Sequence, residues 1–417
     1  MYISPVYYPT STASITTHEV LKGLAEKGNQ MDLLVSSRCF NGCLKGCLFD
    51  CGETEGINVH RVSILTSTVI EQHMSLRLLL FTFSFVPLAL YAFMIAKKRK
   101  HELIMVMYHA THLAPFSAFL VSRVLKIPLM IKIHDAVSSE ARWGMWDKVF
   151  RIILSQLNAI ALKRADRILS LSKELAFLVR RTYGVDEERF AILPNSVDTQ
   201  MFVCDSDGGV FREKLGVQDM KVIMHIGSLV PSYRRNGINF LIQALPLVLS
   251  KEEKVAILLV GEVDARTRKE LAGSVSALKI ENHLKFVGQV AYKDMPKYIS
   301  IADVCIGPLC PSMDTYGSTP RKVLEYMACA KPVIACKGCV ARDLVVNGYN
   351  GLLVHYGDIE ELAYCIAKFI GDEKLAETIG TNGRSLAKTS YAQRVLANRL
   401  DKEIKELLSI HYSKPTS

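Results

Sequence analysis

The chain has 417 residues, 49% of them hydrophobic and 22% charged, which is typical of globular proteins and too long for one ordinary hydrophobic core. The formal net charge is +10, and this excess of cations favours nucleic acid, an acidic membrane surface or a phosphate-bearing ligand as partner. The sequence contains no RNA- or DNA-binding motif and no basic low-complexity tail, so nucleic acid is not expected. It contains no signal peptide either, and we therefore expect a cytoplasmic protein whose 11 cysteines remain thiols.

Strand-like apolar runs alternate with helical patterns along almost the whole chain, which is the signature of parallel α/β domains. In the first half the expected strands are residues 2–4, 31–35, 59–62, 104–108, 129–133, 167–171 and 190–193. In the second half they are residues 222–226, 255–260, 284–287, 304–306, 333–335 and 351–354. The polar segment DSDGGVF at 205–211 lies between the two sets and predicts a linker. Two such sheets in tandem predict a ligand site in a cleft between domains.

Residues 78–96 carry no charge and are followed by the basic run KKRK at 97–100. A membrane span, a helix lying at a membrane interface and a buried core helix all fit this length and composition. A span would place the strands before residue 64 and the strand at 104–108 on opposite sides of the bilayer, although they should share one sheet. We therefore favour a membrane-facing helix whose basic end meets acidic headgroups.

Cys39, Cys43, Cys47 and Cys51 recur at a regular interval. A metal site is one interpretation, but zinc ligands usually come as closer pairs with a distant second pair. The favoured interpretation is a glycine-rich loop that carries thiols, and no metal site is predicted. The D-x-D sequence at 205–207 is likewise read as linker polarity.

The stretch STPRKVLEYMA at 318–328 predicts the start of a helix. Pro320 suits the first helical position, and Ser318 or Thr319 suits the N-cap. The helix follows the strand predicted at 304–306, so it begins at the carboxyl edge of a sheet, where open α/β sheets bind ligands.

Two cations stand in the first turn of this helix, Arg321 and Lys322, although the amino terminus of a helix is already its positive pole. At 100° per residue they share one face with Glu325, opposite the apolar face that would pack on the sheet. A bound diphosphate would balance the cations, and Glu325 could accept hydrogen bonds from a sugar or ribose diol. The alternative is a solvated helix face with incidental charges.

A second loop of this kind lies in HIGSLVPSYRRNGINF at 225–240. Gly227 follows a strand, and Gly237 is predicted to stand where the next helix begins. Arg234 and Arg235 lie between the two glycines and suit phosphate oxygens. The alternative is a surface loop whose arginines face water.

Taken in order, the motifs of the chain resemble a GT-B glycosyltransferase of family 4, which transfers sugars from nucleotide donors with retention. The resemblance rests on ISPVYYP, IPLMIKIHD, ADRILSLS, YGVDEERFAILPNSVD, HIGSLVP with NGINFLIQA, LLVGE, LKFVGQV, ADVCIGP, STPRKVLEYMACAKPVIA and NGYNGLLV. It implies two Rossmann-like domains facing across a cleft. We place the acceptor domain at 1–203, the donor domain at 204–388 and a last helical segment at 389–417 that packs back toward the first domain.

The resemblance also implies a donor-binding set in the second domain. Glu325 would bind the ribose, and the turn of Gly317, Ser318 and Thr319 would lie against the diphosphate and sugar. The remaining positions implied for the donor are Gly227, Ser228, Gln289, Val290 and Arg321, with Gln289 and Val290 presenting backbone to the base. His134 would face the donor sugar from the first domain, and Asn195 and Asp198 in PNSVD would lie near the hinge.

The sequence departs from the family pattern at three places. Gly317 stands where many relatives have a first glutamate, and Asp314 is a possible substitute. Ser228 and Asn236 replace the usual Arg and Lys of the first loop, so Arg234 or Arg235 would supply the charge. Residues 10–14 replace the glycine pair expected after the first strand.

The mechanism implied is retaining transfer without a metal, a cofactor or a protein nucleophile. Lys322, Arg234 and Arg235 would stabilise the leaving diphosphate of a UDP- or GDP-sugar, and His134 would polarise the sugar side. The hydrophobic, basic first domain suggests a glycan or lipid-linked acceptor and a peripheral position on the inner membrane face. A sugar-nucleotide epimerase and a catalytically weak sugar-nucleotide-binding paralogue stay open as alternatives.

Overall fold

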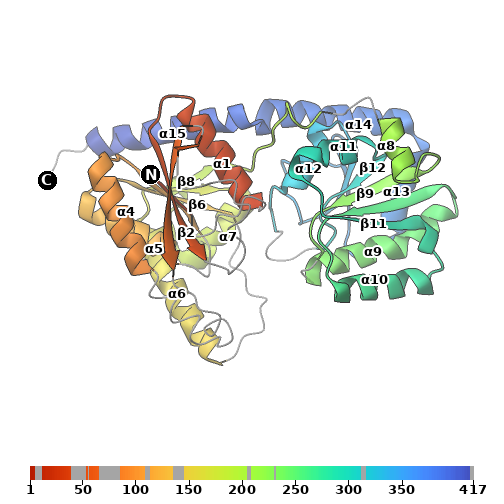
Figure 1. Cartoon of the computed structure of the whole chain (residues 1–417), viewed down its shortest axis with the longest axis horizontal. Coiled ribbons are helices and arrows are strands. Elements are labelled where there is room, and N and C mark those ends of the chain that lie inside the picture. Colours follow the sequence, from red (N-terminus) through yellow and green to blue (C-terminus); the bar gives the residue numbers. More distant parts are fainter. Residues whose placement is uncertain are drawn as a thin grey trace. The chain divides into compact units, whose positions relative to one another are not determined.

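A computed structural model of the chain describes residues 1–4, 12–38, 53–54, 56–64, 85–108, 113–134, 145–203, 208–229, 232–310 and 316–413. The chain divides into two compact units, Met1–Pro194 with Arg394–Ser417, and Asn195–Gln393. Each unit is built on its own parallel sheet with helices on both faces (Figure 1). The predicted α/β class with two sheets is confirmed.

The first sheet has the strand order β3-β4-β2-β1-β5-β6-β7-β8. All its pairs are parallel except β3 with β4. The strands are β1 (Tyr2–Ser4), β2 (Met31–Arg38), β3 (Glu53–Thr54), β4 (Ile57–Ile64), β5 (Ile104–Tyr108), β6 (Leu129–Ile133), β7 (Arg167–Ser170) and β8 (Phe190–Ile192). Central strands such as β5 and β6 are buried throughout, and strands covered on both faces are nearly continuous apolar runs. This is why every one of them was predicted except the two-residue β3.

Helices cover both faces of the first sheet. One face packs α1 (Thr12–Ala25) and α15 (Gln393–Ser413) through residues that include Leu21, Leu24, Leu396 and Leu400. The other packs α4 (Phe85–Arg99), α5 (Ala114–Leu125), α6 (Met145–Arg164) and α7 (Lys173–Tyr183). The C-terminal segment Arg394–Ser417 belongs to this unit.

Helix α4 contains the described part of the apolar segment 78–96. Leu88, Ala92 and Ile95 are buried against the sheet, whereas Leu90 and Met94 are 61% and 55% exposed. The strands on either side of this segment share one sheet, as the sequence analysis required. Among the helices that the structure describes, none combines the length and the apolar character needed to cross a membrane.

The second sheet has the order β11-β10-β9-β12-β13-β14, and all its pairs are parallel. Its strands are β9 (Lys221–Ile226), β10 (Val255–Val260), β11 (Leu284–Gly288), β12 (Val304–Ile306), β13 (Val333–Cys336) and β14 (Leu352–Val354). The chain adds β10 and β11 on one side of β9 and then β12 to β14 on the other. The strand order therefore reverses between β9 and β12, which creates a topological switch point.

Two layers of helices cover the second sheet. Helices α9 (Ser232–Leu249), α10 (Ala265–Ala277), α13 (Ile359–Gly371) and α14 (Glu373–Leu386) contribute to one core cluster. Helices α8 (Gly208–Lys214), α11 (Met295–Ser300) and α12 (Arg321–Ala328) border the other. Figure 1 shows α9 and α10 on one side of this sheet and α8, α11 and α12 on the other.

Two local predictions in this unit are wrong. The segment 205–211 is not simply a linker, because α8 begins at Gly208 and its Phe211 packs on Tyr298 with ring centroids 4.7 Å apart. Gly237 does not open a helix, because α9 already begins at Ser232. A Cβ at Gly237 would lie 3.3 Å from the backbone nitrogen of Cys310, so this glycine permits close packing inside the helix.

Candidate functional site

Three neighbouring strands of the second sheet lead into glycines at its carboxyl edge. Gly227, Gly261 and Gly288 have φ of +140°, +144° and +84°, values that glycine adopts readily. The N–H of Gly227 donates to the carbonyl of Val260, and that of Gly261 to the carbonyl of Gly288, each at 2.8 Å. A Cβ on Gly261 would lie 2.2 Å from the carbonyl oxygen of Gly227. This edge of the sheet is therefore lined by backbone without side chains, as close approach of a ligand requires.

Helix α12 is anchored beside this glycine row. The Tyr326 hydroxyl oxygen accepts a hydrogen bond from the N–H of Ile226, the last residue of β9, at 2.8 Å. Burial raises the pKa of Tyr326 well above its usual range, so the hydroxyl stays neutral at physiological pH. The start of α12 thus lies at the switch point between β9 and β12, where open α/β sheets bind ligands.

The start of α12 differs from the predicted cap. Pro320 is the N-cap residue rather than the first helical residue, and it makes no side-chain cap hydrogen bond. The Ser318 hydroxyl donates to the carbonyl of Cys339 at 3.2 Å. The Thr319 hydroxyl oxygen accepts from the N–H of Asn195 at 3.1 Å. The cap prediction is wrong because both hydroxyls fasten the loop to other segments.

The loop 317–319 is held on two sides before α12 begins. On one side the N–H of Gly317 donates to the carbonyl of Gly338 at 3.3 Å, and the N–H of Ala341 donates to the carbonyl of Ser318 at 2.8 Å. On the other side the Asn195 side-chain amide donates to the carbonyl of Thr319 at 2.8 Å. A loop fixed in this way can present a constant backbone surface to a ligand.

Lys322 connects the two basic loops that the sequence analysis singled out. A Cβ built on Gly227 would lie only 2.7 Å from the Lys322 Nζ, so the ammonium group rests against the bare backbone at the end of β9. Lys322 Nζ also lies 3.2 Å from His225 Nε2, and His225 Nδ1 lies 3.1 Å from the carbonyl oxygen of Ile306. Since Nδ1–H donates to that carbonyl, Nε2 accepts from the ammonium group. The structure brings Lys322 and Gly227 together, as an anion site at this edge requires.

Arg321 has different surroundings from its neighbour. It is only 5% exposed, and its Nε lies 3.3 Å from Oε1 of Glu325, which is 6% exposed. The Tyr292 hydroxyl donates to the same Oε1 at 3.2 Å and accepts a hydrogen bond from Arg321 Nη2. The alternative of a solvated helix face is wrong for Arg321 and Glu325, because both are buried and in contact with Tyr292.

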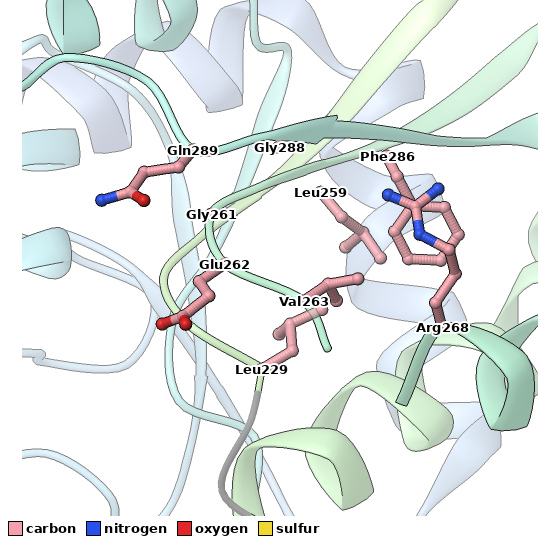
Figure 2. Close-up of a pocket in the computed structure, with 9 residues that line it drawn as sticks. All are labelled: Leu229, Leu259, Gly261, Glu262, Val263, Arg268, Phe286, Gly288 and Gln289. Atoms are coloured by element: carbon pink, nitrogen blue, oxygen red, sulfur yellow. The ribbon is translucent and has the colours of Figure 1, made fainter. Parts of the chain in front are cut away.

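A cavity of about 220 Å³ opens beside the glycine row. Figure 2 shows its apolar middle, with the Arg268 guanidinium over the Phe286 ring on one side and the Gln289 and Glu262 side chains on the other. The Arg268 guanidinium carbon lies 4.8 Å from the centre of the ring. The full lining is Leu229, Leu259, Gly261, Glu262, Val263, Arg268, Phe286, Gly288 and Gln289. The apolar middle and the polar side chains at its two ends suit a flat group with polar edges.

The other predicted positions are distributed as follows. Ser228 is half-buried directly after Gly227, and Val290 packs at the edge of the core. Arg234 and Arg235 lie in the first turns of α9 rather than in a loop, and their side chains are outside the described residues. His134 follows β6 in the other unit.

Several further positions fall outside the described residues. These are the cysteines at 39–51, the D-x-D at 205–207, Asp314 and residues 10–11 of the segment that replaces the glycine pair. Within the described ranges, no group of histidine, cysteine and carboxylate side chains has an arrangement that could hold a metal ion. Asp198, which the sequence analysis placed near the hinge, accepts from the N–H groups of Gln200 and Met201 and stabilises a turn.

Two residues of this site, Tyr292 and His225, were not predicted from sequence. They touch Glu325 and Lys322 from positions 33 and 97 residues away. Asn195 was predicted near the hinge, but not its contact with Thr319, 124 residues away. Contacts of this range leave no local spacing signal. Gly261 could have been found, because it ends the apolar run of β10 as Gly227 ends that of β9.

Two family models match the chain. The model described as Glycosyltransferase Family 4 matches residues 13–201, and the model described as Glycosyl transferases group 1 matches residues 220–372. The first match falls almost entirely on the first unit, and the second lies within the second unit.

Individual relatives and solved structures are also similar to the chain. The alpha-D-kanosaminyltransferase of Streptomyces kanamyceticus is 21% identical over 290 residues, which are 69% of this chain and 72% of that protein. The GDP-mannose-dependent alpha-(1-6)-phosphatidylinositol monomannoside mannosyltransferase of Mycolicibacterium smegmatis is 29% identical over 213 residues, 50% of this chain and 54% of that protein. The chain thus spans about half the length of this second relative. The crystal structure of Anabaena Alr3699/HepE in complex with UDP has a TM-score of 0.74 and 22% identity, covering 97% of this chain and 99% of that one.

Proposed function

The chain belongs to the group 1 glycosyltransferases of the family 4 type and has their GT-B fold, and we propose that it transfers a sugar, with retention, from a nucleotide-diphosphate donor to a glycan or lipid-linked acceptor. The observation that carries this proposal is the placement of Lys322 Nζ against Gly227 at the switch point of the second sheet. A cation, a bare backbone edge and the positive end of α12 converge there, which is a suitable environment for a diphosphate.

The donor lies along this edge in the proposed complex. Its diphosphate meets Lys322 and the backbone of Gly227, Ser228 and the 317–319 loop. Its ribose meets Glu325, which Arg321 and Tyr292 hold in place. Its base enters the cavity lined by Gly288 and Gln289, with the backbone of Gln289 and Val290 at its edge.

UDP or GDP as the nucleotide is supported by UDP in the Anabaena structure and by the GDP-mannose dependence of the mycobacterial relative.

Catalysis in this proposal is stabilisation of the leaving diphosphate. Negative charge grows on the diphosphate as the glycosidic bond breaks, and a fixed cation there lowers the barrier more than it favours the bound donor. Lys322 supplies that cation, without a metal ion or another cofactor, and Arg234 and Arg235 add charge from the start of α9. His134 polarises the donor sugar from the first unit, and the acceptor hydroxyl loses its proton to the leaving phosphate.

The acceptor proposal rests on the outer face of α4. Val86, Leu90 and Met94 are exposed at intervals of four residues, so they share one helix face. The exposed Lys97, Lys98 and Lys100 follow at the end of the same helix. An apolar stripe with cations at one end suits the interface of an anionic bilayer. We therefore propose a cytoplasmic protein that lies peripherally on the inner membrane face, where lipid-linked acceptors are found.

The function is tested with a panel of labelled UDP- and GDP-sugars, with and without a lipid extract. A glycosyltransferase releases nucleotide and labels a product only when acceptor is present. An epimerase converts the donor without acceptor, and a binding paralogue does neither. Lys322→Ala and Glu325→Ala should each reduce both transfer and nucleotide binding, and unchanged values for both variants would overturn the site.

Membrane association is tested by co-sedimentation with vesicles of phosphatidylcholine, with or without phosphatidylglycerol. The chain should sediment with the anionic vesicles, and L90Q/M94Q should sediment less. V210Q, at an exposed apolar residue of α8 in the second unit, is the control and should behave as wild type. A wild-type chain that never sediments with anionic vesicles refutes this part of the proposal.

A further inference from the structure

Glu325 is held by two donors that converge on one of its oxygens. Arg321 Nε lies 3.3 Å and the Tyr292 hydroxyl 3.2 Å from Glu325 Oε1. The Tyr292 hydroxyl accepts in turn from Arg321 Nη2. Arg321 and Glu325 are almost completely buried, so water does not compete effectively for these hydrogen bonds. The carboxylate is fixed before any ligand arrives.

Tyr292 is itself fixed by rings and charge. The Arg321 guanidinium carbon lies 5.2 Å from the centre of the Tyr292 ring, and the Phe202 ring centre lies 5.5 Å from it. Both contacts restrict the ring. Its hydroxyl therefore reaches Glu325 from one constant direction.

The chain position of Tyr292 connects two parts of the proposed donor site. Tyr292 opens the short turn η3 (Tyr292–Asp294), which follows the proposed base-contacting residues Gln289 and Val290. Arg321 and Glu325 lie one turn apart on α12. The hydrogen bonds between them therefore join the base loop to the carboxylate proposed to read the ribose.

We propose that Tyr292 and Arg321 are positioning residues that hold Glu325 in the rotamer that binds the ribose hydroxyls, and that they thereby set the preference for ribonucleotide over deoxyribonucleotide donors. The inference rests on the proposed function, in which Glu325 binds the ribose. A free glutamate must lose side-chain freedom when it binds a diol, whereas a glutamate already fixed at Oε1 does not. A carboxylate has about four acceptor positions on two oxygens, so it can be held and still accept from a diol.

A purely structural role makes a different prediction. If the three residues only anchored α12, loss of the Tyr292 hydroxyl would weaken ribose and deoxyribose ligands alike. If they position Glu325 for the ribose, loss of the Tyr292 hydroxyl would weaken only the binding of ligands that carry the ribose hydroxyl groups. Removing the hydroxyl from the protein and from the ligand in turn separates these two cases.

The experiment measures affinities of the full chain by calorimetry for UDP, GDP and their 2′-deoxy and 3′-deoxy counterparts. Wild type should bind the ribose form of its preferred nucleotide at least about tenfold more tightly than one deoxy form, as expected for hydrogen bonds to a charged group. Y292F should reduce this preference about fivefold or more, with affinity for the deoxy form almost unchanged. R321K, which keeps the charge but not the planar fork, should reduce the preference similarly.

Y298F is the matched control. Tyr298 lies in α11 of the same unit, and its ring packs on Phe211, so Y298F should keep the wild-type preference. E325Q should lose the preference for ribose over deoxyribose nucleotides whether or not Tyr292 and Arg321 position Glu325. It therefore tests the proposed role of Glu325 itself.

The outcomes are distinguishable. If E325Q loses the ribose preference while Y292F and R321K keep it, Glu325 reads the ribose and the positioning inference is wrong. Equal weakening of ribose and deoxyribose ligands by Y292F and R321K also overturns it. If wild type binds neither UDP nor GDP, or shows no ribose preference, the proposed role of Glu325 fails and the inference fails with it.

Discussion

Two basic segments of this chain look alike in sequence but differ in their physical surroundings. The run 97–100 lies at the end of α4, where cations interact favourably with the negative pole of the helix dipole, and its lysines are exposed. Arg321 and Lys322 open α12, at the positive pole, and neither side chain is exposed. Cations at the unfavourable pole of a helix require a partner. Arg321 contacts Glu325, whereas Lys322 contacts His225.

The two cations of α12, Arg321 and Lys322, also differ from each other in their surroundings. Arg321 is paired with Glu325 inside the protein, whereas Lys322 Nζ lies 3.2 Å from His225 Nε2 and against the backbone of Gly227. Because Lys322 lies at the glycine-lined edge of the sheet, it is the better candidate for contact with a bound anion.

The largest expected effect concerns stability at Arg321. Arg321→Met leaves the Glu325 carboxylate buried without its cation, and breaking such a pair typically costs about 3–5 kcal/mol. Lys322→Met removes a cation from the positive end of a helix and should change stability by less than about 1 kcal/mol. Urea unfolding of the two variants without ligand measures the difference. Equal destabilisation would mean that the two cations are not distinct.

The next effect concerns activity at Lys322. Lys322→Ala should lower the transfer rate by about 100- to 1000-fold, the usual loss when one donor to a developing negative charge is removed. Initial rates with the sugar nucleotide identified in the donor panel measure this. Lys269→Ala, at an exposed lysine of α10, should retain the wild-type rate. A Lys322→Ala enzyme as fast as wild type would contradict the assignment.

A third cation, Lys132, lies in the interior of the first unit. Lys132 in β6 is 2% exposed, and burial lowers its pKa to about 8, although Glu19 acts to raise it. The unfolded lysine titrates near 10.4, so between pH 8 and 10 the unfolded chain binds more protons than the folded one. The free energy of unfolding should therefore gain about 2 kcal/mol from this group as the pH rises from 8 to 10.

The measurement for Lys132 is urea unfolding at pH 8, 9 and 10. Lys132→Met should lack this gain, while Lys163→Met, at an exposed lysine of α6, should keep it. The same pH dependence in wild type and Lys132→Met would show that the buried lysine is not its source.

The smallest effect per residue is expected at the end of α4. The triple variant K97Q/K98Q/K100Q should weaken binding to anionic vesicles by about fivefold for each lysine replaced, because an exposed cation near the membrane surface contributes about 1 kcal/mol and is screened by salt. The triple variant K251Q/K254Q/K279Q alters exposed lysines of the second unit and removes the same net charge. It should bind vesicles as wild type does. If both triple variants lose binding equally, only total charge matters and the α4 surface is not specific.

Much of the fold could be predicted because parallel strands buried on both faces are continuous apolar runs. The bounds of β5, β6 and β12 agree with the prediction to the residue. The apolar face of α12 was also predicted, since Val323, Leu324 and Met327 are buried against the sheet. The segment 205–211 was mistaken for a linker because its polar, glycine-bearing sequence does not show that Phe211 is covered by Tyr298.

By itself the sequence determined the two sets of strands, the glycines that end them and the presence of two cations in the first turn of α12. These are local properties, set by hydrophobic periodicity and backbone conformation within a few residues. Only the tertiary structure decided what surrounds each of the two cations, because Tyr292 reaches Glu325 and His225 reaches Lys322 across long stretches of chain. The contacts of Arg321 with Glu325 and of Lys322 with His225 depend on which strands lie next to each other. That strand order arises only when the second sheet assembles.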